Sequence, residues 1–202
     1  MCYSLQVDTS VSNLEKRLNR PVSLKKYKQG LQLGFVHPST PVVTSKHPNE
    51  ITDLEWGLIP FWAKDKSIQK NTLNAKIETL HEKPSFRNII NQRCLVIVNG
   101  FFEFQWLDEK GKKKQKYLIT LPESELFCLG GLWSEWVDKT TGEALQTFTI
   151  VTTEANALMR EIHNTKQRMP VILTPQNEED WLHGQNIERF AHPEVELKAE
   201  MV

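Results

Sequence analysis

Several segments of the chain alternate apolar and polar residues with a period of two, which is the pattern of β-strands that bury one face. These segments are also rich in the β-branched and aromatic residues that strands favour. Strands are therefore predicted over residues 3–7, 41–44, 53–58, 93–99, 101–107, 116–121, 127–137 and 146–152. Polar, glycine-containing clusters at 108–111 and 138–142 predict turns, so the strands on either side of each cluster are expected to form a hairpin.

Short helices are predicted where capping residues precede an apolar stretch. The predicted helices cover residues 12–18, 84–90, 154–162 and 175–182. Ser12 opens a capping box with Glu15, while Thr153 and Thr174 are the expected caps of the last two helices. From about Ile187 the chain is expected to be a polar tail.

Together these elements predict an α+β fold: a mostly antiparallel, curled or barrel-like sheet with a few peripheral short helices. A length of 202 residues favours a single domain over residues 1–202. No apolar run approaches the roughly 18–20 residues that a membrane span needs. Because the first residues resemble no secretory signal, we expect a cytoplasmic protein, and we expect it to be a monomer.

Charge and cysteine content narrow the possible partners. The chain has 25 basic and 25 acidic residues, so any nucleic acid would have to be held by a local patch. One candidate is the lysine run at 110–116, which fits either a solubilising loop or weak phosphate contacts. The three cysteines include no CxxC pair, which argues against disulfides and a zinc site, and we predict no metal or cofactor. Cys94 and Cys128 lie in apolar strands and are expected to be buried.

Cys2 offers a different chemistry. If Met1 is removed, Cys2 presents an α-amine and a thiol on adjacent carbons. An α-amine has an ordinary pKa of about 8, so about a tenth of it is neutral near pH 7, and this fraction can attack an aldehyde to form an imine. The thiol can then close a thiazolidine ring. On its own, a cysteine at position 2 can equally be incidental.

Two further segments carry candidate side chains. Alternation places Glu103 on the same face of its strand as Phe101, within an otherwise apolar segment. Burial there would raise the pKa of the carboxyl group toward neutrality, as an acid–base role requires. Trp56 is expected in the core, whereas Trp62 stands where the sequence becomes polar and could stack on unpaired bases.

The remaining candidates lie in polar segments. Asn74 and Lys76 belong to a stretch that reads as a loop or a frayed helix. His163 follows a predicted helix and precedes Lys166 and Arg168, so it could transfer a proton beside a phosphate clamp. A lone histidine is also often structural or solvated.

Taken in order, these segments resemble the motifs of the SOS-response-associated peptidase (SRAP) family, the abasic-site processing proteins. The resemblance runs from Cys2 to about Leu173. Its motifs are Met1-Cys2, Trp-Gly-Leu-Ile-Pro-Phe-Trp at 56–62, Asn-Ala-Lys-Ile-Glu at 74–78, Gly-Phe-Phe-Glu-Phe at 100–104, and His163 followed by Arg-Met-Pro-Val-Ile-Leu at 168–173.

This resemblance implies a protein that recognises an abasic site in single-stranded DNA and cross-links itself to the ring-opened sugar through a thiazolidine. It assigns the catalytic roles to Cys2 as nucleophile, Asn74 as the residue that orients the site, and Glu103 and His163 as an acid–base pair. It assigns phosphate contacts to Lys76 and Arg168, and a stacking or wedging role to Trp62. It also implies that the protein removes its own initiator residue.

Two departures from the family pattern are visible. The family often has arginine where this chain has Lys76. Arginine can donate two hydrogen bonds to one phosphate, whereas lysine offers a single compact charge. The family's usual spacing between the histidine and the Arg-Met-Pro motif is three residues shorter than here. Either His163 keeps its place while the loop bulges, or another group supplies the proton.

Two other functions fit the same residues. A cysteine peptidase would use the Cys2 thiolate to attack a carbonyl group, with His163 as its base. A non-covalent single-strand binder would need only Trp62 and the basic residues.

Overall fold

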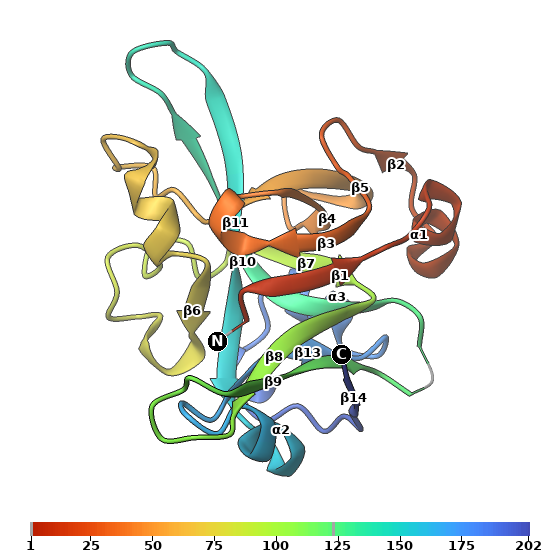
Figure 1. Cartoon of the computed structure of the whole chain (residues 1–202). Coiled ribbons are helices and arrows are strands. Elements are labelled where there is room, and N and C mark those ends of the chain that lie inside the picture. Colours follow the sequence, from red (N-terminus) through yellow and green to blue (C-terminus); the bar gives the residue numbers. More distant parts are fainter. Residues whose placement is uncertain (1, 123) are drawn as a thin grey trace.

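The computed structural model describes residues 2–122 and 124–202, and it confirms an α+β fold built on curled, mostly antiparallel sheet (Figure 1). The first sheet has five strands in the order β14-β9-β8-β1-β3. Its members are β1 (Ser4–Val7), β3 (Gly30–Leu33), β8 (Gly100–Trp106), β9 (Lys114–Thr120) and β14 (Lys198–Met201).

The second sheet is larger, and its main path runs β12-β11-β10-β7-β4-β5-β2. On this path lie β2 (Val22–Ser23), β4 (Ser39–Thr44), β5 (His47–Trp56), β7 (Arg93–Val98), β10 (Phe127–Val137), β11 (Ala144–Glu154) and β12 (Arg168–Pro170). Two short strands join it from the side, β6 (Asn74–Lys76) against β11 and β13 (Ile172–Leu173) against β10.

The two sheets are linked where β7 leads directly into β8. Asn99 donates its backbone N–H to the Gln6 carbonyl, 2.9 Å away, and Gly100 begins β8 beside β1. A side chain at Gly100 would bring a Cβ within 2.7 Å of the Ile119 carbonyl oxygen, so the close approach of β8 and β9 requires glycine there.

Strand alternation explains how one sheet serves two cores. In β7, Cys94 and Val96 face the cluster between the sheets, while Leu95 and Ile97 face a second cluster. The helices α1 (Val11–Leu18) and α3 (Glu178–Leu182) cover the second cluster with Leu14 and Trp181. Because both faces of β7 are covered, its sequence is continuously apolar from Cys94 to Val98.

The predicted strands are confirmed with shifted ends, but three helix predictions need correction. Residues 84–90 form successive turns, because their backbone bonds mostly reach back three residues rather than four. β11 continues through Glu154 because it pairs with β12, so α2 (Ala157–Ile162) begins only after Asn156, which caps it. Residues 175–177 form a turn, and α3 begins after Asn177.

The first helix was placed almost correctly. It begins at Val11, and Ser10 rather than Ser12 caps it by accepting the Asn13 N–H at 3.2 Å. The short 3-10 helices are η1 (Gly34–Val36), η2 (Lys66–Asn71), η3 (Ile77–Thr79) and η4 (Ile187–Phe190).

The prediction of a polar tail from about 187 is wrong. Ile187 and Phe190 of η4 are buried, and β14 pairs with β9. Val195, Leu197 and Ala199 pack against the core cluster between the sheets. These three residues alternate with charged ones, which is a strand pattern rather than a tail pattern.

No helix among the described residues combines the length and apolar content needed to cross a membrane.

Candidate active site at Cys2

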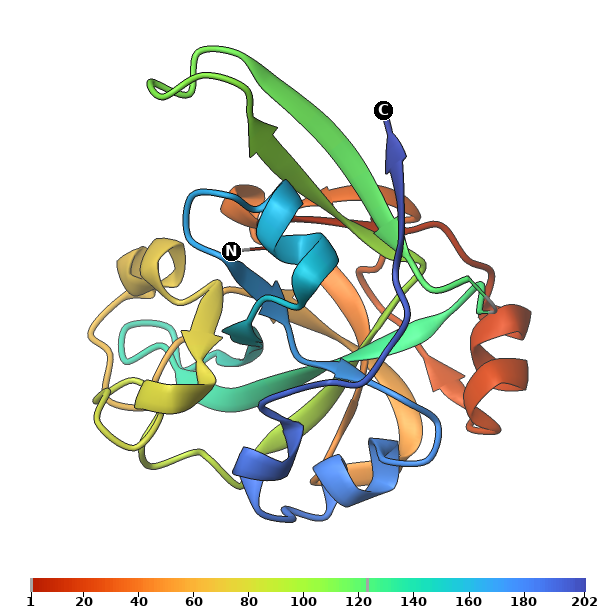
Figure 2. The same ribbon diagram turned by 90° about the horizontal axis from the view of Figure 1, so that it is seen from below.

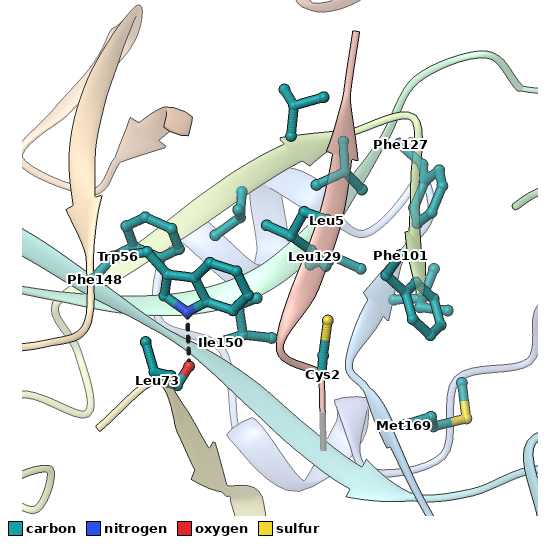
Figure 3. Close-up of a cluster of buried hydrophobic side chains, with 14 of the residues drawn as sticks. Cys2, Leu5, Trp56, Leu73, Phe101, Phe127, Leu129, Phe148, Ile150 and Met169 are labelled. Carbon is teal, nitrogen blue, oxygen red and sulfur yellow. Dashed lines mark hydrogen bonds between the residues drawn. The ribbon is translucent and has the colours of Figure 1, made fainter. Parts of the chain in front are cut away.

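Cys2 enters the core just before the first strand. Its side chain is 1% exposed and belongs to the cluster between the sheets, together with Leu5, Phe101 and Met169 (Figure 3). The thiol lies 3.7 Å from the Ser4 carbonyl oxygen. Burial, together with the nearby Glu103 carboxyl group, raises the pKa of the Cys2 thiol well above its ordinary value. The described thiol is therefore a neutral S–H group.

Asn74 contacts Cys2 directly. Its side-chain amide donates a hydrogen bond to the Cys2 carbonyl at 2.8 Å. Asn74 is held by the parallel pairing of β6 with β11, and the Trp56 indole donates to the carbonyl of the preceding Leu73 at 2.9 Å (Figure 3). The side-chain oxygen of Asn74, Oδ1, is buried and accepts no hydrogen bond from the described part of the chain. The amide thus holds Cys2 with one end and leaves an acceptor at the other.

Glu103 lies on β8, which pairs with β1. Ser4 stands opposite Phe102, so Glu103 is one residue further along, toward Cys2. Its side chain is buried, as the alternation predicts, and burial raises the pKa of its carboxyl group from 4.5 to about 7. A carboxyl group with this pKa can both give and take a proton near neutral pH.

His163 ends α2 and is buried. Its Nδ1 atom lies 2.9 Å from the Arg168 carbonyl oxygen, and the Arg168 backbone N–H points to the same atom at 3.2 Å. Burial lowers the pKa of His163 from 6.5 to about 4, so the ring is neutral at pH 7.

The long connection from His163 to Arg168 bulges outward without separating its two ends. Gln167 adopts a left-handed backbone, with φ of 50°, and donates its N–H to the His163 carbonyl at 2.9 Å. Ile162 and Met169, the residues flanking this segment, belong to the same core cluster as Cys2. The loop therefore bulges while its ends stay together, and the catalytic role of His163 stays a prediction.

Arg168, predicted to contact phosphate, is paired with a carboxylate of the chain itself. Its guanidinium group donates to both carboxylate oxygens of Glu78, at 2.7 and 2.9 Å, and to the Thr152 carbonyl at 2.7 Å. The Arg168 side chain is 10% exposed and that of Glu78 is 43% exposed. Burial alone would raise the pKa of Glu78, but the Arg168 guanidinium outweighs it and lowers that pKa. Lys76, two residues before Glu78, is exposed at the end of β6.

Trp62 is 44% exposed, as expected for a residue that could stack on a base, whereas Trp56 is buried. The Trp62 indole donates to the Pro84 carbonyl at 3.3 Å. Next to it, Ala63 is buried and accepts a hydrogen bond from the Trp136 indole at 2.8 Å, which anchors the loop that carries Trp62.

Two features near the site were missed by sequence reasoning. One is the pairing of Glu78 with Arg168, for which the only sequence signal was an acid close to Lys76. The other is an aromatic pair beside Cys2, in which the rings of Tyr3 and Phe35 lie 5.0 Å apart. Phe35 and its apolar neighbour Val36 are both exposed, and the Phe-Val pair was the available signal.

The structure thus brings Cys2, Asn74 and Glu103 together and joins His163 to Arg168. Met1, whose removal the proposed chemistry requires, lies outside the described residues. Within residues 2–122 and 124–202, no group of three or more His, Cys, Asp or Glu side chains could hold a metal ion.

Comparison with known proteins gives the same picture over nearly the whole chain. The family model for SOS response associated peptidase (SRAP) matches residues 1–200. The abasic site processing protein YoqW of Bacillus subtilis is 42% identical over 168 residues, which cover 78% of this chain and 72% of that protein. The abasic site processing protein HMCES of Gallus gallus is 30% identical over 61% of this chain and 42% of its own length.

Solved structures share the fold. A protein from Bacteroides thetaiotaomicron is 33% identical and superimposes with a TM-score of 0.90, covering 100% of this chain and 92% of its own. A protein from Bordetella bronchiseptica, 22% identical, shows the same fold with a TM-score of 0.84, covering 100% of this chain and 99% of its own.

Proposed function

The chain belongs to the SOS response associated peptidase family, and we propose that it processes abasic sites in DNA by cross-linking itself to them through Cys2. The relatives named as abasic site processing proteins support the substrate. The observation that carries the mechanism is the contact between the Asn74 amide and the Cys2 carbonyl, with Glu103 beside it. It fixes the backbone of the nucleophile instead of leaving a mobile chain end.

The first step uses the α-amine that Cys2 acquires when Met1 is removed. The ring-opened abasic sugar presents an aldehyde, and the amine adds to its carbon. Loss of water then gives an imine, for which the departing oxygen must gain protons. Glu103, with a pKa of about 7, is suited to supply a proton and to take one back.

The second step uses the thiol. The sulfur of Cys2 adds to the imine carbon, and the imine nitrogen gains a proton, so that a five-membered thiazolidine closes with no further loss of atoms. Because the thiol is neutral when buried, it needs a base as it reacts. Glu103, whose charge acts on this thiol, is the proposed base, and neutral His163 is proposed to assist the proton transfers.

Asn74 and the basic residues would hold the DNA. The buried Asn74 oxygen that accepts nothing from the described chain is suited to a hydroxyl or amine hydrogen at the reacting centre. Lys76 is exposed and suited to a phosphate, whereas Arg168 can reach one only if Glu78 shares its guanidinium group. Trp62 is proposed to stack on or wedge beside an unpaired base, which favours single-stranded DNA as the partner.

The same site is also proposed to remove Met1. That cleavage must come before the cross-link, because the aminothiol exists only afterwards. A peptidase acting on other proteins through Cys2 is the less favoured alternative. Such an enzyme needs a thiolate, and burial raises the pKa of this thiol.

The test is a denaturing gel of purified protein incubated with single-stranded DNA that contains one abasic site. Intact-mass measurement first establishes that Met1 is absent. Wild type should give a slowly migrating, heat-stable adduct, and acetylation of the α-amine should abolish it because the imine can no longer form.

Cys2→Ala keeps the amine but lacks the sulfur, so any imine it forms should hydrolyse on heating. Cys128→Ala is the matched control, because that buried thiol lies in the other core cluster and should not affect the adduct. An equally heat-stable adduct from Cys2→Ala, or no adduct from wild type, would refute the mechanism.

A further inference from the structure

The hairpin formed by β8 and β9 projects from the molecule (Figure 2), and residues 104–116 of it are called the arm below. The arm carries a concentration of positive charge. Its lysines are Lys110, Lys112, Lys113, Lys114 and Lys116, and only Asp108 and Glu109 oppose them in this segment. The chain as a whole is neutral, so this local excess stands out. Clustered lysines on a projecting arm attract phosphates. A specific binding surface also needs an arm of defined shape.

The turn of this arm is fixed by its own hydrogen bonds. The Asp108 carboxylate accepts the backbone N–H groups of Lys112 and Lys113, at 2.9 and 2.7 Å, and these bonds lower the pKa of Asp108. Gly111 has φ of 62° and packs so closely on Trp106 that a Cβ would lie 2.6 Å from the ring. The acid is therefore occupied by backbone, while the side chains of Lys112 and Lys113 are exposed.

The base of the arm is tied to the loop that follows His163. The Asn164 side chain accepts from the backbone N–H of Trp106 at 3.1 Å and donates to the Trp106 backbone carbonyl at 2.9 Å. Gln105 also donates to the Glu161 carbonyl at 3.1 Å. The arm is thus held in a set position relative to α2 and the loop that follows His163.

One face of the arm combines cations with apolar rings. The ammonium group of Lys114 lies 5.0 Å from the centre of the Trp106 ring, and that of Lys116 lies 4.0 Å from the Phe102 ring. Between these pairs, Phe104 is 41% exposed, and it stands opposite Lys116 in the sheet register. Alternating cations and aromatic surface suit a nucleic-acid strand with unstacked bases.

We propose that residues 104–116 form a second binding surface for single-stranded DNA, which holds the strand flanking the abasic site. This surface rests on the proposed function for the identity of its ligand, but it takes no part in the reaction. Lys112 and Lys113 contact phosphates, and Phe104 contacts a base or sugar. DNA long enough to span both places binds more tightly than DNA that fills only the reacting site.

The test uses fluorescence anisotropy with lesion-free single-stranded oligonucleotides of about 5 and about 20 nucleotides, in a Cys2→Ala background that cannot form the thiazolidine. The double variant Lys112→Gln/Lys113→Gln keeps both backbone N–H groups, so the turn is preserved. It should bind the long oligonucleotide several-fold more weakly. The slope of log binding constant against log salt concentration should become shallower by about 1.4, or about 0.7 for each lost phosphate contact. Since the short oligonucleotide cannot span both places, its binding should weaken less than that of the long one.

The matched control is Lys25→Gln/Lys26→Gln, which removes the same charge from two exposed lysines after β2, on the side of the molecule away from the arm (Figure 1). An equal loss in both double variants would mean a general charge effect and would overturn the proposal. So would unchanged binding in Lys112→Gln/Lys113→Gln, or no DNA binding by the parent protein. If the parent binds DNA while wild type forms no adduct, the cross-linking function fails and the surface stands.

Discussion

Glu103 combines a chemically useful carboxyl group with a position that disfavours its charge. It lies among apolar side chains on the inner face of β8, and burial raises its pKa from 4.5 to about 7. In the unfolded chain the same group would ionise near its ordinary value. The folded protein therefore holds a proton that the unfolded chain releases, and the cost of losing that proton appears as pH rises.

This sign leads to a stability prediction for Glu103→Gln. Below pH 4.5 both states of wild type are protonated at this position, so the variant and wild type should differ little in pH dependence. Between pH 4.5 and about 7 wild type should lose up to roughly 3 kcal/mol of unfolding free energy, which the uncharged glutamine avoids. Urea denaturation at pH 4.5, 6 and 8 measures the difference.

Glu15→Gln on the exposed face of α1 serves as the control and should follow wild type at each pH. The prediction fails if Glu103→Gln also follows wild type. The same substitution should slow adduct formation at least tenfold, since glutamine cannot exchange the proton.

At the scale of elements, the site depends on short strands that other strands hold in place. β6 and β12 each pair with β11, which places Asn74 and Arg168 on neighbouring segments. The ion pair between Glu78 of η3 and Arg168 of β12 joins these segments across β11. Since the Arg168 backbone also contacts the His163 ring, the ion pair helps to hold His163.

Glu78→Gln tests this connection. Glutamine preserves the size of the side chain but removes the charge that faces a guanidinium group largely shielded from water. We expect a loss of about 1 kcal/mol in unfolding free energy, reduced from a fully buried value because Glu78 is nearly half exposed. We also expect slower adduct formation, measured on the gel described above.

The comparison is Glu135→Gln, whose partner Lys46 is half exposed and 3.7 Å away, and which should lose no more than about 0.5 kcal/mol. Equal losses in the two variants would show that the Glu78 pair is an ordinary surface contact. Adduct formation by Glu78→Gln at the wild-type rate would refute its positioning role.

At the scale of the whole molecule, the C-terminal segment forms an edge of the first sheet. β14 pairs with β9, and the residues before it pack on the cluster that contains Cys2. The end of the chain therefore contributes to the same core as its beginning.

Deleting residues 197–202 should consequently lower stability while leaving the reacting residues in place. Loss of Leu197, Ala199 and the β14 ladder should cost roughly 2 kcal/mol, or about 4–8 °C in melting temperature for a chain of this size. Calorimetry gives this value, and Met201→Ala, which removes only an exposed side chain, should change it little. A melting temperature unchanged by the deletion would show that residues 197–202 do not stabilise the fold.

Sequence alone determined much of the β-structure, because strand formation with one or two buried faces imposes a local period that can be read directly. It also located Glu103 correctly, since a carboxyl group in register with Phe101 must point inward. The burial of Trp56, Cys94 and Cys128 followed from the same local pattern. The family motifs added the candidate roles, which local patterns do not contain.

Tertiary structure decided what depends on contacts between distant segments. β6 is too short to show a period and is a strand only because β11 lies beside it. The extended path of Glu154 depends on pairing with β12, and the contact of Asn74 with Cys2 spans 72 positions in the sequence. The Arg168–Glu78 pair, 90 positions apart, likewise exists because folding brings opposite charges together where water is partly excluded.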